Sequence, residues 1–175
     1  SRYVNAVMIR ANNHRDIIEF AKYSTVPVIN GLSDLEHPCQ VLGDVYTILE
    51  KKCKIKNPDE GCGATNSLKS GIDELKNLKI TFIGDGNNVA NSWILAAALL
   101  SMKLVVCTPE GFEPNKEIVQ KSYEICKSTR GEITLSNDPI SAVNSSDVIY
   151  TDVWTSMGKE EESQTRKQVF SKYQV

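Results

Sequence analysis

The sequence predicts an α/β protein in which parallel sheets carry helices on both faces. Two observations support this prediction. Short apolar segments typical of buried parallel strands alternate with segments of helical periodicity along most of the 175 residues. Such alternation favours parallel strands joined by right-handed helical crossovers. The composition, with 41% apolar and 24% charged residues, is that of a globular protein and excludes a disordered, collagen-like or coiled-coil chain.

The first block of expected elements lies within residues 1–50. It comprises strands at residues 5–10 and 26–30 and helices at residues 16–23 and from residue 38 onward. The first strand is a short apolar run that ends in Arg10, and Gly31 ends the second. Apolar residues at positions 41, 42, 45, 48 and 49 form one face of the last helix, about three turns long. Pro38 suits its first position, where a missing N–H removes no helical hydrogen bond.

Residues 51–77 are expected to form a linker or a surface insertion. The segment contains three glycines and an Asn-Pro-Asp sequence but few large apolar residues. Regular alternation resumes after it, with strands expected at residues 79–84, 104–107, 132–135 and 147–151 and helices at residues 90–102 and 115–128. Asp138 and Pro139 predict the start of a further short helix, and three glutamates at 160–162 predict the first turn of another.

The charge balance and the cysteines exclude several classes of function. Lys and Arg number 20 and Asp and Glu number 22, which gives a net charge of −2 and a pI near 5.7. We therefore expect no broad surface for nucleic acid or an anionic membrane. The longest strictly apolar run, residues 94–100, is far shorter than the roughly 20 residues of a membrane helix, and no secretory signal is visible. Five cysteines without a CxxC spacing, and two histidines far from any cysteine pair, favour reduced thiols over a zinc site.

Unusual polar residues follow the expected strands. Arg10 closes the first strand, His37 and Gln40 begin the helix after the second, residues 85–88 follow the strand at 79–84, and residues 152–158 follow the strand at 147–151. Ligands of open α/β sheets bind outside the carboxyl ends of the strands. The pattern therefore predicts one cleft between two lobes.

Two of these segments suggest kinds of ligand. Residues 84–89 (Gly-Asp-Gly-Asn-Asn-Val) resemble a dinucleotide-binding fingerprint, but Val89 stands where its third glycine would be. The alternatives are a tight turn with no ligand, or a turn that presents Asn88 to a small polar ligand. At the helix beginning with Pro38, unpaired N–H groups suit an anionic or carbonyl-bearing ligand near His37 and Gln40. An isolated histidine favours a structural role, but the presence of Arg10 on a neighbouring strand end favours a ligand site.

Four segments resemble, in order, motifs of the ornithine carbamoyltransferases within the aspartate/ornithine carbamoyltransferase family. They are residues 6–10, residues 30–34 with 37–40, residues 84–88 and residues 151–158, and they span nearly the whole chain except 51–77. The His-Pro-x-Gln element is shared across carbamoyltransferases, whereas Asp-x-Trp-x-Ser-Met-Gly is specific to the ornithine branch. The resemblance implies the C-terminal part of a carbamoyl phosphate-binding domain with its connecting helix at 1–50, a linker or insertion at 51–77, and a Rossmann-like ornithine-binding domain, incomplete at its C-terminus, at 78–175.

The implied activity is transfer of the carbamoyl group from carbamoyl phosphate to the δ-amine of L-ornithine, giving L-citrulline and phosphate. The resemblance implies a homotrimer. We expect no cofactor and no metal, since the sequence suggests no set of metal ligands, and the reduced thiols fit the cytoplasm or an organelle matrix. The resemblance does not distinguish the biosynthetic from the arginine-degrading direction. We expect small-molecule substrates as partners, with no nucleic acid and no membrane.

The resemblance also assigns roles to single residues. On the carbamoyl phosphate side, Arg10 and His37 are the expected catalytic residues: Arg10 holds the substrate and His37 hydrogen-bonds its carbonyl oxygen. Gln40 accepts a hydrogen bond from the carbamoyl NH2 group. On the ornithine side, the residues that bind the α-amino and α-carboxyl groups are expected to be Asn88, Asp152, Ser156 and Met157. The loop 156–158 closes over the substrate, and its glycine supplies backbone freedom.

Two family motifs do not occur in the sequence. These are a Ser-Thr-Arg-Thr phosphate loop, expected upstream, and a His-Cys-Leu-Pro segment, expected downstream. The chain therefore resembles the middle of an enzyme and is expected to have little or no activity alone. Two alternatives remain: a sister carbamoyltransferase that uses putrescine, N-acetylornithine or another amine, and a non-catalytic module that binds an anion or an amino acid. Trp154 is expected to be a packing anchor, and His14 a surface or capping residue.

Overall fold

The computed structural model describes residues 3–53, 55, 64–154 and 163–175. The strands are β1 (Val7–Arg10), β2 (Val28–Leu32), β3 (Lys79–Ile83), β4 (Lys103–Cys107), β5 (Glu132–Ser136) and β6 (Val148–Thr151). The helices are α1 (His14–Tyr23), α2 (Pro38–Lys51), α3 (Ala64–Leu75), α4 (Asn88–Leu100), α5 (Lys116–Thr129), α6 (Pro139–Val143) and α7 (Ser163–Phe170), followed by the 3-10 turn Ser171–Tyr173. The fold class predicted from the sequence is confirmed, and each expected strand is present within two residues of its predicted bounds.

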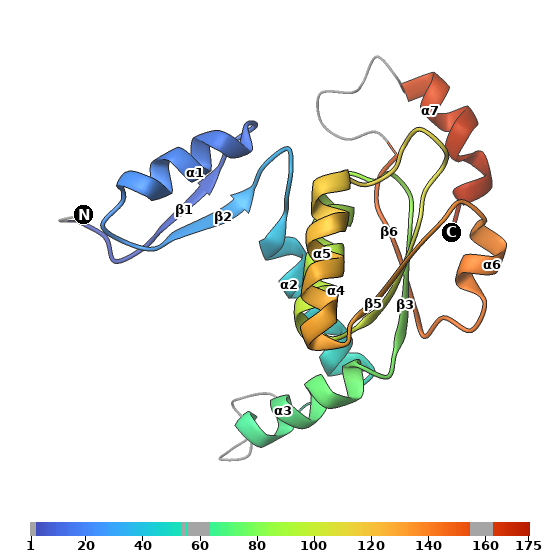
Figure 1. The fold of residues 1–175 in the computed structure, drawn as a ribbon, viewed down its shortest axis with the longest axis horizontal. Coiled ribbons are helices and arrows are strands. Elements are labelled where there is room, and N and C mark those ends of the chain that lie inside the picture. Colours follow the sequence, from blue (N-terminus) through green and yellow to red (C-terminus); the bar gives the residue numbers. More distant parts are fainter. Residues whose placement is uncertain (1–2, 54, 56–63, 155–162) are drawn as a thin grey trace.

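The first unit is a parallel pair of strands, β1 and β2, with α1 packed on one face (Figure 1). Asn13 caps α1 by accepting a hydrogen bond from the backbone N–H of Arg15, so the helix begins at His14. Met8 and Ile29 are exposed on alternating positions of the two strands. Because parallel strands end at one edge, the polypeptide leaves both β1 and β2 on the side that faces the larger unit (Figure 1).

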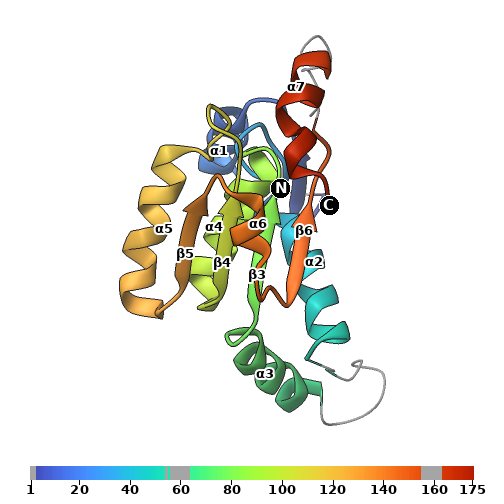
Figure 2. The same cartoon turned by 90° about the vertical axis from the view of Figure 1, so that its right-hand side faces the viewer.

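The larger unit is a four-stranded parallel sheet of order β5-β4-β3-β6. Helices α4 and α5 cover one face, and α6 and α7 lie on the other (Figures 1 and 2). Alternate residues of the central strand β3 serve the two faces: Phe82 packs in the cluster that contains α2 and α4, and Ile83 packs in the cluster that contains Phe170 of α7. Residues 80–83 of β3 are all buried, and three of these four are apolar, as expected of a strand that is covered on both faces.

The segment 51–77, expected to be a linker or surface insertion, contains helix α3. Leu75 is fully buried and Ile72 packs against the same core cluster, so the end of this helix is anchored to the larger unit. The sequence predicted a linker because this segment has three glycines and few large apolar residues. At Gly71 an added Cβ would lie 2.3 Å from a side-chain carbon of Ile55, so this glycine permits a close approach within the core.

The C-terminal elements close the second face of the larger sheet. Phe170 of α7 is fully buried, and its ring lies 6.2 Å from the stacked ring of Trp154. Trp154 is therefore a packing residue, as expected. The glutamates at 160–162 lie outside the described residues. Within the part of the chain that the structure describes, no helix has the length and apolarity needed to cross a membrane.

Candidate active site

The loop after β2 is held against the first half of α4. Three hydrogen bonds join residues 33–37 to this helix: His37 N–H to Ser92 Oγ (2.7 Å), Asn88 Nδ2 to Ser33 O (2.8 Å) and Asn91 Nδ2 to Leu35 O (3.0 Å). Asn91 and Ser92 are buried. The contacts therefore fix the backbone that carries His37 to the rigid core of the larger unit, at the amino end of α4.

His37 occupies the N-cap position of α2 and Pro38 its first turn, as the sequence predicted. The imidazole makes no capping hydrogen bond to its own helix. Its Nδ1 atom is buried and has no hydrogen-bond partner among the described residues. A buried polar atom without a partner is uncommon in folded proteins, and ligand sites are one place where it occurs. The first N–H groups of α2 add partial positive charge next to this ring.

Arg10 is the last residue of β1 and is exposed. It pairs with Leu32, the last residue of β2, after an irregularity in the register at Ile9. The N–H of Ala11 continues the pairing by donating to the carbonyl of Leu32 (3.0 Å). Arg10 therefore stands at the edge from which the loop to His37 departs.

Gln40 lies on the exposed side of α2, in its first turn. Its Nε2 group donates to both carboxylate oxygens of Asp44 (3.0 and 3.2 Å). Asp44 also accepts a hydrogen bond from Tyr150 Oη of β6 (2.9 Å). Burial and the neighbouring Asp44 carboxylate raise the pKa of Tyr150 well above its ordinary value, so the phenol is a protonated donor at neutral pH.

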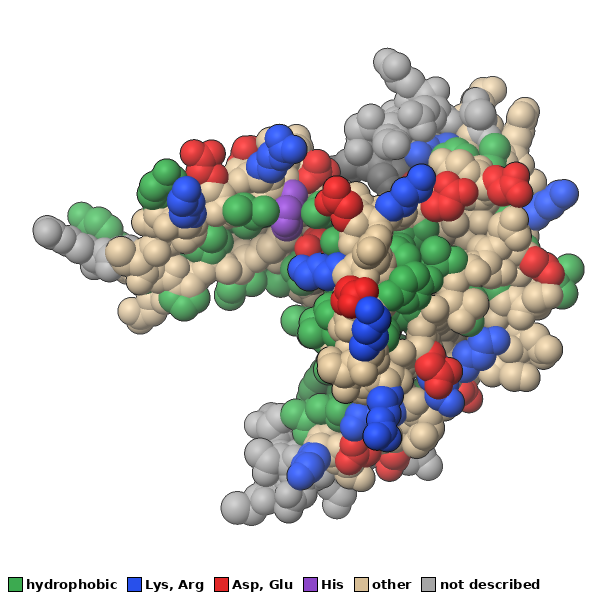
Figure 3. All heavy atoms as spheres, viewed as in Figure 1, with side chains coloured by type: hydrophobic (Ala, Val, Ile, Leu, Met, Phe, Trp, Pro, Cys, Tyr) green, Lys and Arg blue, Asp and Glu red, His purple; other side chains and the backbone are tan. Residues whose placement is uncertain are grey.

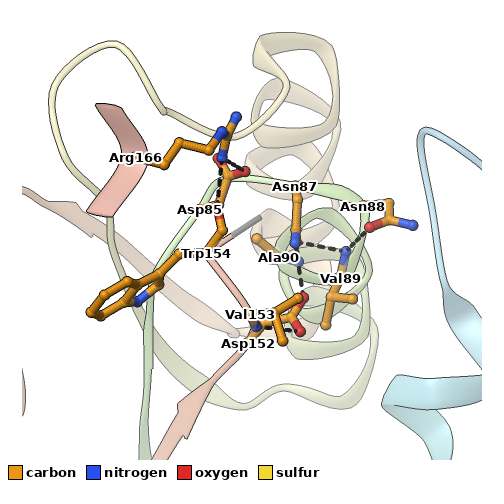
Figure 4. A network of polar contacts seen from close by, with 9 residues as sticks. All are labelled: Asp85, Asn87, Asn88, Val89, Ala90, Asp152, Val153, Trp154 and Arg166. Carbon is orange, nitrogen blue, oxygen red and sulfur yellow. Dashed lines mark hydrogen bonds and ion pairs between the residues drawn. The ribbon is translucent and has the colours of Figure 1, made fainter. Parts of the chain in front are cut away.

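Asp152 follows β6 and lies beside the start of α4 (Figure 4). Asn87 caps that helix by accepting from the N–H groups of Val89 and Ala90, and its Nδ2 donates to Asp152 Oδ2 (2.8 Å). The other carboxylate oxygen accepts from the N–H of Val153 (2.8 Å). A carboxylate has about four acceptor positions, so Asp152 retains capacity for an ammonium group.

Asn88 begins α4, on the side of the helix that faces the loop before α2 (Figure 4). Its side-chain oxygen accepts from the N–H of Val89 (3.1 Å), and one amide proton is donated to Ser33 O. The amide therefore lies where the two units meet. Asn87, which positions Asp152, was not assigned a role from the sequence, although its place before a helix is a typical capping signal.

A buried ion pair joins the loops that follow β3 and β6. Arg166 of α7 is 2% exposed, and its Nη1 atom lies 2.6 Å from Asp85 Oδ2 and donates to the carbonyl of Trp154 at 3.0 Å (Figure 4). The guanidinium carbon lies 4.9 Å from the centre of the Phe112 ring, within the range of a cation–π contact. Arg166 thus joins the loop after β3 to the loop after β6. The role of Arg166 was not predictable from the sequence, because no local pattern pairs residues so far apart in the chain.

The turn at 84–86 is shaped by close backbone contacts. A Cβ added at Gly86 would lie 2.3 Å from the nitrogen of Pro114, so only glycine fits there. Gly84 has φ 150°, a conformation that favours glycine. Both glycines therefore have structural roles in the turn that presents Asn87 and Asn88.

The structure brings His37, Asn88 and Asp152 to segments that border the start of α4, while Gln40 lies in the first turn of α2 and Arg10 lies at the end of β1. Ser156 and Met157, also expected at the site, lie outside the described residues, as does the glycine at 158. The described residues contain no group of three or more His, Cys, Asp and Glu that could hold a metal ion. On the face drawn in Figure 3, basic and acidic side chains are interspersed without a broad patch of one sign.

Comparison with known proteins identifies two matching family models. Residues 76–175 match the Asp/Orn binding domain of aspartate/ornithine carbamoyltransferases, and residues 1–50 match their carbamoyl-P binding domain. The whole chain is 50% identical to the ornithine carbamoyltransferase of Archaeoglobus fulgidus and 44% identical to the anabolic enzyme of Pyrococcus furiosus, covering 49% of each. The chain thus spans about half the length of the curated relatives it matches.

Solved structures agree with these matches. The ornithine carbamoyltransferase of Pyrococcus furiosus superimposes with a TM-score of 0.80 at 44% identity, covering 99% of this chain and 49% of that one. The anabolic enzyme of Campylobacter jejuni gives a TM-score of 0.81 at 35% identity, with 99% and 51% covered. The chain therefore belongs to the aspartate/ornithine carbamoyltransferase family.

Proposed function

We propose that this chain is the central part of an ornithine carbamoyltransferase, which transfers the carbamoyl group of carbamoyl phosphate to the δ-amine of L-ornithine. The relatives quoted above carry that name. The observation that carries the proposal is the meeting of two segments at the start of α4: the loop bearing His37 is bound to Ser92, and Asp152 is bound to Asn87. One segment falls in the match to the carbamoyl-P binding domain and the other in the match to the Asp/Orn binding domain.

The proposed domain division follows the same matches. Residues 1–50 are proposed to supply part of the carbamoyl phosphate-binding domain with its connecting helix, and residues 78–175 to supply an ornithine-binding domain, in keeping with the matches at 1–50 and 76–175. Residues 51–77 join them and contribute α3. The separate sheets β1-β2 and β5-β4-β3-β6 support this division.

On the carbamoyl phosphate side, Arg10 and His37 are the proposed catalytic residues. Attack of the neutral δ-amine on the carbamoyl carbon builds negative charge on the carbonyl oxygen. In a closed site, each fixed hydrogen-bond donor aimed at such an oxygen stabilises the transition state by about 3–4 kcal/mol. His37 suits this role because its backbone is fixed to α4, while the cationic Arg10 matches the charge of the phosphate leaving group.

On the ornithine side, Asp152 is the proposed counter-charge for the α-ammonium group, and Asn88 is the proposed donor to the α-carboxylate. Asn87 and the backbone of Val153 each hold one oxygen of Asp152, which keeps the carboxylate in one orientation. Ser156 and Met157 are proposed to complete this half of the site. Family membership also supports a homotrimer in the cytoplasm or an organelle matrix, which size-exclusion chromatography and cell fractionation would test.

The test is citrulline formation by the full-length polypeptide that contains these residues. Carbamoyl phosphate and L-ornithine should give citrulline, whereas putrescine and N-acetylornithine should react at least tenfold more slowly, since neither has the free α-amino acid that Asp152 and Asn88 would bind. Preference for putrescine or N-acetylornithine would contradict the substrate assignment. The 175-residue chain alone should show little or no turnover, and a rate near that of the full-length polypeptide would contradict the proposal that it is a central part.

A further inference from the structure

A chain of hydrogen bonds links Gln40 to the larger sheet. Gln40 Nε2 donates to Asp44, and Tyr150 Oη donates to the same carboxylate. Gln40 and Asp44 are one turn apart on α2, whereas Tyr150 lies on β6, two residues before Asp152. Figure 2 shows α2 next to the β6 edge of the sheet.

Tyr150 is a rigid anchor for this contact. Its ring stacks on Phe82 with a centroid distance of 5.7 Å and lies 5.1 Å from the tilted ring of Trp93. Both of these rings are fully buried, so the position of the phenol oxygen is fixed by the core. Asp44, which is half-buried, is therefore held at a defined place although it belongs to the surface of α2.

The chemistry of Asp44 determines which end of the Gln40 amide faces it. An ionised carboxylate only accepts hydrogen bonds, whereas the two ends of a glutamine amide are a donor and an acceptor of nearly equal shape. Asp44 binds the NH2 end, and the carbonyl end of Gln40 then points away from Asp44. Without the carboxylate, both amide orientations would be accessible on an exposed side chain.

We propose that Asp44 is a positioning residue that makes the site selective for a donor with an N–H group, by keeping the carbonyl oxygen of Gln40 available to accept from it. This inference rests on the proposed function and on the role that the family resemblance implies for Gln40, which is to accept a hydrogen bond from the carbamoyl NH2 group. With the amide reversed, two NH2 groups would face each other and no hydrogen bond would form. An acyl phosphate that carries a methyl group in place of NH2 gains nothing from either orientation.

The experiment compares carbamoyl phosphate with acetyl phosphate, which has a methyl group in place of NH2 and is added as a competing ligand, on the full-length polypeptide. Asp44→Ala should raise the KM for carbamoyl phosphate roughly five- to tenfold, the effect of one lost hydrogen bond. The Ki for acetyl phosphate and the KM for ornithine should stay within about twofold. Gln40→Ala should give the same selective loss, and the double variant should lose no more than either single variant because the two residues act together.

Two further variants keep the test decisive. Asp44→Asn preserves shape but lets its own amide face Gln40 with either end, so it should give a smaller rise of the same selective kind. Tyr150→Phe removes the hydroxyl group that binds Asp44 and leaves the sequence of α2 unchanged. It should also give a smaller, selective rise in the KM for carbamoyl phosphate. Asp73→Asn serves as a control, because Asp73 is another helical carboxylate that binds a nearby side chain: it lies on α3, far along the chain, and pairs at 2.6 Å with Lys76, the residue that follows this helix.

The outcomes separate the two proposals. A KM for carbamoyl phosphate that stays within twofold in Asp44→Ala, or that rises in equal proportion to the Ki for acetyl phosphate, would overturn the inference while leaving the proposed function intact. Absence of citrulline formation by the unaltered full-length polypeptide would overturn the proposed function and this assignment with it. A selective rise in Asp44→Ala and Tyr150→Phe, with Asp73→Asn unchanged, is the predicted result.

Discussion

Removal of Arg166 is expected to destabilise the larger unit strongly. The Arg166→Gln change removes a guanidinium that is 2% exposed and leaves the Asp85 carboxylate, 2.6 Å away in the native pair, buried without its counter-charge. Breaking a buried ion pair by removing one partner costs about 3–5 kcal/mol, more than the pair itself contributes relative to apolar residues. Arg166→Lys keeps the charge but loses the planar contact over Phe112 and the second hydrogen bond, so its cost should be intermediate.

The measurement is equilibrium urea denaturation of the 175-residue chain. Both of its tryptophans, Trp93 and Trp154, lie in the larger unit, so their fluorescence reports the unfolding of this unit. The double variant with Asp85→Asn should be less destabilised than the sum of the single variants, because it leaves no uncompensated charge. Lys127→Gln is the control, since Lys127 and Glu124 form an exposed pair at 2.6 Å and such pairs contribute little. A cost below about 1 kcal/mol for Arg166→Gln would refute the reasoning, since a buried pair should cost several times that.

Three further predictions concern Asp152, Gly86 and Cys107. Asp152→Asn should raise the KM for ornithine roughly 30-fold or more in the full-length polypeptide, because losing one partner of a buried charge pair costs about 2–5 kcal/mol. The KM for carbamoyl phosphate should not change. Equal changes in both KM values would contradict this prediction. Gly86→Ala should lower the free energy of unfolding by about 1–3 kcal/mol, since the added Cβ would lie 2.3 Å from Pro114 N. Urea denaturation that gives the variant the same free energy of unfolding as the unaltered chain would contradict this. Burial raises the pKa of the Cys107 thiol to about 11, so the folded state keeps its proton longer than the unfolded state does. Stability from this group should be complete below about pH 9 and lost as the pH rises toward 11, and a Cys107→Ala variant should show a shallower decline over that range.

The sequence was sufficient for the elements with strong local patterns. Apolar runs such as that of β4 and periodic faces such as that of α2 predicted the strands and helices, because both of these elements bury a regular set of side chains. Capping residues were equally informative: Pro38 and Asp138 each predicted a helix start that the structure contains. Helix α3 was not predicted, because its apolar residues at 68, 72 and 75 are sparse and a glycine interrupts them.

The candidate site was predictable only at the level of strand ends. The rule that polar residues after parallel strands gather at one edge led to His37, Asn88 and Asp152. It could not predict that Asn88 would bind Ser33, or that Asp44 would join Gln40 to Tyr150, because these contacts depend on how the two units pack. The pairing of Asp85 with Arg166 across 81 residues likewise depends on the approach of α7 to the sheet.

The most direct test of the central claim is a crystal structure of the full-length polypeptide with carbamoyl phosphate and L-norvaline, which has the α-amino and α-carboxyl groups of ornithine but no δ-amine to react. The carbonyl oxygen of carbamoyl phosphate should lie within hydrogen-bonding distance of His37, and the α-amino group of norvaline should contact Asp152. Both molecules should then lie next to each other beside the start of α4. Ligands bound at separate places, or packed protein between His37 and Asp152, would contradict the account.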